Sequence, residues 1–241
     1  AAAWARRRRG VPVVLPTALL GLVVFQALLG MWTVTLLLKP LIVLAHLLGG
    51  LTLLAGLAWL AASHAPRLPA LPHPPGLRRL LGLALAVLVL QISLGGWTST
   101  NYAALACPDF PTCQGQWWPR TDFDAAFVPW HGLGIDYEGG ILDGPARTAI
   151  HMAHRLGALA ATAAVGALAL AALRRRRARP LRVAGGVVGV LLLVQLGLGI
   201  ANVVWLLPLG VATAHNAGAA LLLLALVLFL RLLTRSMPDA R

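Results

Sequence analysis

The chain has 241 residues, of which 59% are hydrophobic and only 11% are charged, with a formal net charge of +13. This hydrophobic fraction is higher than a soluble domain of the same length needs, and it indicates a membrane protein. The basic residues gather in the stretches 6–9, 67–79, 174–182 and 231–241, without interleaved aromatic residues. The charge therefore predicts membrane topology and excludes a nucleic-acid partner.

Apolar runs long enough to cross a bilayer, which takes about 20 residues, recur along the whole chain. In order they cover 11–35, 41–62, 78–99, 147–172, 181–206 and 209–233. Pro12 and Pro16 fall at the start of the first run, where a helix tolerates proline. The sequence thus predicts an all-α, polytopic membrane protein with six transmembrane helices.

The placement of the charges predicts the orientation of these helices. Cytoplasmic segments are enriched in lysine and arginine, and the basic stretches all fall on the side of the two termini. The exceptions on the other side are Lys39, Arg120, Arg147 and Arg155. We therefore expect both termini in the cytoplasm and the polar segment 100–147 outside it.

Segment 100–147 contains the two cysteines of the chain, Cys107 and Cys113. Thiols outside the cytoplasm are oxidised, so we predict a disulfide that closes a short loop. A zinc site is the alternative, but two thiolates without a nearby Cys or His pair fall short of a ligand set. Nearly all acidic residues lie in this segment, with Trp117, Trp118 and Trp130, which we interpret as anchors at the membrane interface.

An internal repeat is visible at an offset of about 169 residues. It superposes Gln26 on Gln195, Gly30 on Gly199, His46 on His215 and Gly49 on Gly218. The string QISLGGWTST at 91–100 also resembles QALLGMWTVT at 26–35. We expect a four-helix unit in 78–241, an antiparallel bundle, and the second half of a related unit in 1–77. Two helices would then be missing upstream, as the absent initiator Met also suggests.

Histidines inside predicted helices are the candidate chemical groups, because an ionisable side chain in hydrocarbon is costly. His154 and His215 each lie roughly 10 Å below the external face, from a rise of 1.5 Å per residue. Two neutral imidazoles at one depth in a four-helix bundle can hold a heme iron from both sides. A hydrogen-bonded core residue is the alternative for a lone histidine. The matched depth and the repeat counterpart His46 favour heme ligation.

His151 lies one turn from His154 and competes with it as a ligand. Arg155 follows His154 directly, and a guanidinium near the membrane face suits a heme propionate. We therefore predict His154 as the ligand, with His151 nearer the surface. We expect His64 and His73 to be solvated, and His131 has no evident partner. Gly157 and the glycines in 94–96 and 196–199 could serve close helix packing or make room for a macrocycle.

The strings GGWTSTNYAALACPDFPTCQGQWWP, HMAHRLGAL and VATAHNAGAALLLLAL resemble the C-terminal half of the bacterial heme A synthase family. This resemblance implies that the chain contains six of the family's eight helices. It places them in the bacterial inner membrane, with segment 100–147, the Cys loop, on the periplasmic side. It implies heme b on His154 and His215 and a disulfide between Cys107 and Cys113. It also implies that His46 belongs to a second, catalytic site for heme O, whose C8 methyl is oxidised to a formyl group to give heme A for cytochrome oxidase.

The resemblance also suggests partners: heme O synthase as the supplier of heme O, membrane lipid, and a respiratory electron acceptor that the sequence does not identify. The sequence allows a homo-oligomer. No carboxylate lies inside any predicted helix, so the oxidation would depend on heme iron, with the protein supplying ligation, orientation and a dry site. Two further classes share the paired histidines: a di-heme b-type membrane electron carrier, and a non-catalytic heme-handling assembly protein.

Overall fold

The computed structural model describes residues 13–64, 75–132 and 134–235. The long helices are α2 (Val14–Thr35), α3 (Pro40–Ser63), α4 (Pro75–Thr100), α6 (Gly144–Leu173), α7 (Arg179–Val204) and α8 (Leu209–Arg235), and α5 (Phe123–Ala126) is a single turn. Six of these helices are long and apolar enough to cross a membrane. The described ranges contain helices and no named strand. The predicted class, an all-α multi-pass membrane protein, is confirmed.

The observed helices follow the predicted apolar runs to within a few residues, and local chemistry sets several of their ends. A proline stands in the first turn of α3, α6 and α7, where its missing N–H costs nothing. Asp143 caps α6, because its Oδ1 accepts a hydrogen bond from Ala146 N at 2.9 Å. The α6 helix therefore begins before residue 147, at the acidic edge of the external segment.

The helices α2, α4 and α7 end in the same way. Their last turns close through hydrogen bonds from Leu38 N to Thr33 O (2.9 Å), from Ala103 N to Thr98 O (2.9 Å) and from Leu207 N to Asn202 O (2.7 Å). The residue before each donor is left-handed: Leu37 at φ 52, Tyr102 at φ 54 and Leu206 at φ 56. This is a Schellman cap, here built without glycine. The sequence repeat is therefore also a repeat of backbone geometry, in three copies.

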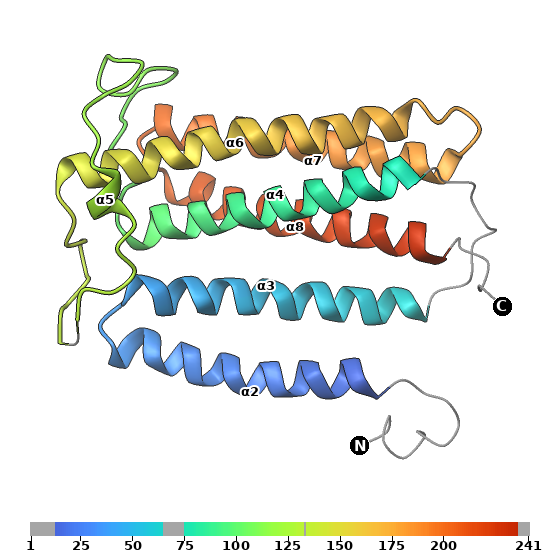
Figure 1. Cartoon of the computed structure of the whole chain (residues 1–241), viewed down its shortest axis with the longest axis horizontal. Helices are drawn as coiled ribbons and strands as arrows, with labels where there is room; N and C mark the ends of the chain where they lie inside the picture. Colours follow the sequence, from blue (N-terminus) through green and yellow to red (C-terminus); the bar gives the residue numbers. More distant parts are fainter. Residues whose placement is uncertain (1–12, 65–74, 133, 236–241) are drawn as a thin grey trace.

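Four of the helices pack in a closed ring, α4 on α6, α6 on α7, α7 on α8 and α8 on α4. The α3 helix packs on α8 and α4, and α2 packs on α3. Figure 1 shows α2 and α3 along one edge of the molecule, with the long α4–α6 connection at the end opposite to the start of α2 and the end of α8. These contacts agree with a four-helix unit; the division at residue 77 stays a prediction.

The main buried apolar cluster of this ring lies mostly away from the α4–α6 connection. Its buried members stop at Ile92 on α4 and at Leu192 on α7, and they begin at Val165 on α6 and at Leu222 on α8. A second buried cluster, with Trp97 on α4 and Ala149 and Ile150 on α6, lies at the end near the α4–α6 connection. Along α6, His154 lies between the two clusters.

The α4–α6 connection also reaches the α2–α3 turn. Tyr137 N donates a hydrogen bond to Leu37 O at 3.1 Å, and Lys39 Nζ donates to Gly132 O. The Lys39 side chain is only 2% exposed. Its ammonium lies 3.1 Å from the centre of a Trp130 ring. The external segment thus fastens the α2–α3 hairpin to the rest of the protein.

Candidate functional site

Three helix hairpins each carry one of the predicted histidines, and each is closed by the same contact. The glutamine on the first helix donates its side-chain N–H to the backbone oxygen of the histidine on the second. The bonds are Gln26 to His46 (2.8 Å), Gln91 to His154 (3.0 Å) and Gln195 to His215 (3.0 Å). They give each amide nitrogen a hydrogen-bond partner between apolar helices and join the two helices at the level of the histidine.

Two glycines complete each copy. A Cβ on Gly30, Gly95 or Gly199 would lie 3.3, 3.1 and 3.1 Å from Cε1 of the histidine in its own hairpin. A Cβ on Gly49, Gly157 or Gly218 would come within 2.2 to 2.3 Å of the glutamine Oε1. The glycines of the first set leave space for the edge of the imidazole ring. Those of the second set leave space for the glutamine amide. Close packing therefore accounts for these glycines, and a role in making room for a macrocycle stays a prediction.

His154 and His215 belong to helices that lie diagonally across the ring, since α6 and α8 each contact α4 and α7. Their side chains are close enough to interact electrostatically. Both are partly buried, and neither belongs to the main buried apolar cluster. The structure thus brings together the two histidines that the sequence predicts to act as a pair.

The donor atoms of this pair suit a metal-bound macrocycle. The Nδ1 atom of His154 lies 3.0 Å from the Gln91 amide nitrogen, which leaves its other ring nitrogen available. The Nδ1 atom of His215 is buried without a hydrogen-bond partner. An unpaired buried nitrogen costs free energy, and either nitrogen of a neutral imidazole can bind a metal. The residues present therefore fit a heme.

His46 occupies the equivalent place in the α2–α3 hairpin. Its Nδ1 is buried without a partner, as it is in His215. Of the helices that pack closely on α3, only α8 carries a histidine, His215, which is near His154. The assignment of His46 to a second heme site stays a prediction.

The structure gives the other histidines different surroundings. His151 is 4% exposed, and its Nδ1 lies 3.0 Å from Ala103 O, so it supports the start of the external segment. His64 is exposed and contacts Leu60 O at 2.9 Å. The His131 ring lies 6.4 Å from that of Tyr137, a neighbour that the sequence did not reveal. His73 lies outside the described residues.

A disulfide joins Cys107 and Cys113, and both cysteines are buried. Arg155 holds the same loop: its guanidinium donates to Thr112 O at 2.7 Å and to Asp109 O at 2.6 Å. It also reaches Pro111 O at 3.3 Å and Cys107 O at 3.5 Å. The residue after His154 therefore holds the Cys loop. This contact was not predicted from sequence, and a propionate role for Arg155 stays a prediction.

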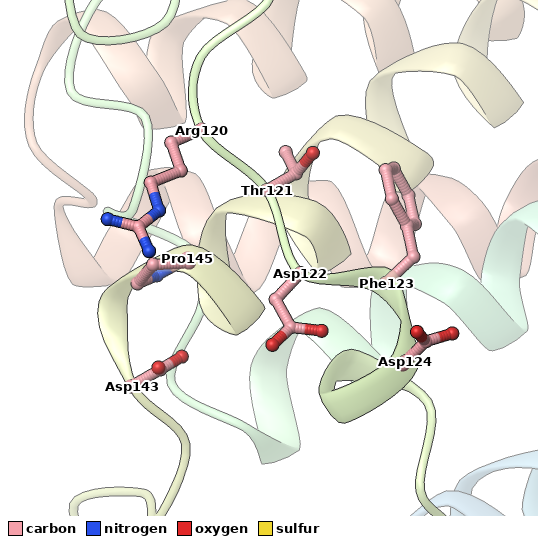
Figure 2. Close-up of a pocket in the computed structure, with 7 residues that line it drawn as sticks. All are labelled: Arg120, Thr121, Asp122, Phe123, Asp124, Asp143 and Pro145. Carbon is pink, nitrogen blue, oxygen red and sulfur yellow. The ribbon is translucent and has the colours of Figure 1, made fainter.

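A polar hollow lies beside α5, lined by Arg120, Thr121, Asp122, Phe123, Asp124, Asp143 and Pro145 (Figure 2). Two of its carboxylates serve as helix caps, Asp122 for α5 and Asp143 for α6. Within the described ranges, no group of three or more His, Cys, Asp and Glu residues could hold a metal ion. The caps give these two carboxylates a structural role.

The fold and the site define a class: a polytopic helical-bundle membrane protein with a histidine pair suited to heme. Residues 1–227 match the COX15-CtaA family, described as Cytochrome oxidase assembly protein. The chain belongs to this family.

Relatives of the chain include proteins named Heme A synthase. The one from Shewanella oneidensis is 46% identical over 221 residues, which cover 90% of this chain and 65% of that protein. The one from Methylobacterium radiotolerans is 34% identical over 180 residues, covering 73% and 45%. For Methylobacterium nodulans the identity is 32% over 186 residues, covering 76% and 48%. The chain spans about half to two thirds of the length of these relatives.

Proposed function

We propose that the chain is the heme b-binding part of a heme A synthase, which oxidises the C8 methyl group of heme O to a formyl group and supplies heme A to cytochrome oxidase. Family membership and the names of the relatives support this function. The observation that supports it is the pair His154 and His215, which lie on diagonal helices of one ring and near enough to interact electrostatically.

The chain's own residues would bind and orient the hemes. His154 and His215 would hold heme b through their ring nitrogens, and the apolar helices around them would exclude water. His46 would contribute to the site of the substrate, heme O. When bound, the heme supplies the redox chemistry; none of the long helices contains a carboxylate that could act as an acid or base.

The proposal includes a location and partners. The arginine-rich connections favour cytoplasmic termini and a periplasmic Cys loop in a bacterial inner membrane. A heme O synthase would supply the substrate, and a respiratory component would accept the electrons. A di-heme electron carrier would use the same histidine pair, but the names of the relatives favour the enzyme.

The test is coexpression of the full reading frame with a source of heme O, followed by extraction and chromatography of the hemes. Heme A should appear with the wild-type protein and disappear with His154→Ala or His215→Ala, together with the low-spin heme b spectrum. His64→Ala is the matched control, because its exposed ring contacts only its own helix in the described structure. Low-spin heme b without any heme A would favour an electron carrier and overturn the proposed activity.

A further inference from the structure

Two glutamine side chains lie against the rings of the proposed heme ligands. Gln91 Nε2 is 3.0 Å from both the backbone oxygen and the Nδ1 atom of His154. Gln195 Nε2 is 3.0 Å from the backbone oxygen of His215 and 3.4 Å from its ring Nε2. Both amide oxygens are buried without a hydrogen-bond partner. A buried amide oxygen without a hydrogen bond costs free energy between apolar helices. A polar side chain at these two positions is therefore unfavourable for packing alone.

Fastening the hairpin explains only part of the arrangement. Gln26 makes the same bond to the backbone oxygen of His46, at 2.8 Å. For Gln91 and Gln195, the structure records a further contact with a ring nitrogen. The ring contact is thus separable from the contact that joins the helices, and it occurs at the two histidines proposed to hold heme b.

An amide has the right chemistry for a partner of a metal-bound imidazole. When one ring nitrogen of a neutral imidazole binds a metal, the other carries the proton and needs an acceptor. A glutamine offers N–H donors at one end and an oxygen acceptor at the other, and rotation of the amide exchanges them. The unused Oε1 of Gln91 could therefore receive a proton donated by Nδ1 of His154. Such outer partners fix the ring orientation and raise the basicity of the ligand.

We propose that Gln91 and Gln195 are positioning residues for the heme ligands His154 and His215. In the structure each amide nitrogen contacts the backbone oxygen and a ring nitrogen of its ligand residue. With heme bound, the amide would turn its oxygen to the protonated ring nitrogen in place of the backbone contact, and so orient the ring and tune how strongly the imidazole donates to iron. Gln26 has the hairpin role alone. The inference rests on the proposed function only in requiring heme b at the His154–His215 pair.

The experiment compares Gln91→Leu, Gln195→Leu and Gln91→Glu with the matched control Gln26→Leu, in the full reading frame. The reduction potential of the low-spin heme and its retention are measured. The leucine variants at 91 and 195 should raise the potential, because a weaker donor stabilises ferric iron less. They should also weaken heme binding about 10-fold or more. Gln91→Glu should lower the potential, because a carboxylate is a stronger acceptor.

The control removes the same helix-to-helix bond in another hairpin and should leave the potential of the low-spin heme unchanged. If Gln91→Leu and Gln195→Leu retain heme at the wild-type potential, or if Gln26→Leu shifts it equally, the inference is wrong and the proposed function still stands. Gln91→Glu keeps the size of the side chain and gives a second reading if a leucine variant fails to fold. A wild-type protein without bis-histidine heme would overturn the proposed heme site as well.

Discussion

Arg155 Nη2 donates a hydrogen bond to the backbone oxygen of Asp109 at 2.6 Å, which joins α6 to the Cys loop across 46 residues of sequence. The Asp109 carboxylate organises the same loop from inside. It accepts hydrogen bonds from the Thr112 hydroxyl, from Gln114 N at 2.5 Å and from Gly115 N at 3.0 Å. The loop is therefore held by the disulfide, a carboxylate and a guanidinium, the last from the residue next to His154.

Replacing Arg155 with lysine should loosen the Cys loop. An ammonium keeps the charge but lacks the planar fork that spans several carbonyls. A hydrogen bond to a charged group contributes about 1.5 to 3 kcal/mol, which corresponds to roughly 10- to 150-fold faster opening. Amide hydrogen exchange at Gln114 and Gly115 should rise accordingly. Loss of heme with unchanged loop exchange would instead favour the propionate role expected from the sequence.

The Cys loop should also depend on pH through Asp109. The hydrogen bond from Thr112 is the largest cause that holds the pKa of this carboxyl below its ordinary value, and the amides of Gln114 and Gly115 add to it. A lowered folded pKa means that the ionised form stabilises the loop above the unfolded pKa, about 3.9. This stability is lost as the pH falls through the folded pKa.

Amide exchange at Gln114 and Gly115, corrected for the intrinsic pH dependence, should therefore be constant from neutral pH to about 5 and should rise below about 4. Asp109→Asn removes the ionisation and should abolish this step while keeping one carbonyl acceptor. A step of the same size in Asp109→Asn would assign the pH dependence to another group.

The long helices were predictable because each coincides with an uninterrupted run of about 20 or more mostly apolar residues. That His154 and His215 lie near each other was predictable from matched depth along two such helices; their joint binding of heme stays a prediction. The third copy of the hairpin contact, between Gln91 and His154, does not follow from the sequence repeat. Gln91 and His154 are 63 residues apart, whereas Gln195 and His215 are 20 apart. The Cys loop lies between the first pair and breaks the alignment. The spacing His-x-x-Gly, shared by His46, His154 and His215, was the signal that could have revealed it.

Contacts that depend on the fold of the external segment were beyond sequence reasoning. In the sequence, Lys39 is an exception to the charge pattern. Its neighbours along the chain do not indicate that its side chain is only 2% exposed, with its ammonium over the Trp130 ring. Similarly, the closeness of Arg155 to the Cys loop arises only when the loop folds back over the end of α6. Such long-range contacts have no periodic signature along the chain.

Lys39→Met should detach the external segment from the α2–α3 turn. The buried ammonium donates to Gly132 O and lies over the Trp130 ring. A desolvated cation–π contact contributes about 2 kcal/mol and a charged hydrogen bond about 1.5 to 3 kcal/mol; since the two overlap, we expect a loss of about 2 to 4 kcal/mol. Hydrogen exchange at Tyr137 N, which bonds to Leu37 O, should increase. Arg120→Met removes an exposed positive charge from the same segment and should leave this exchange unchanged.

The final prediction concerns His46 and the number of hemes. The α2–α3 hairpin repeats the contacts around His215, including the glutamine bond and the glycine at the ring edge. Its imidazole should therefore be oriented for ligation. However, the only histidine on the helices packed closely against α3 is His215, which is near His154 and is proposed to pair with it. One histidine alone holds a heme less firmly than a pair.

We therefore expect the 241-residue chain, expressed by itself, to bind one heme firmly at His154 and His215, with the His46 site empty or poorly occupied. If the reading frame encodes further helices before this chain, including them should raise the ratio of heme to polypeptide towards two, and His46→Ala should cancel that increase. Pyridine hemochrome absorbance divided by protein from amino-acid analysis measures the ratio. A value near two for the 241-residue chain, with bis-histidine spectra at both sites, would show that His46 finds a second ligand within this chain. The expectation that the His46 site is empty or poorly occupied would then be wrong.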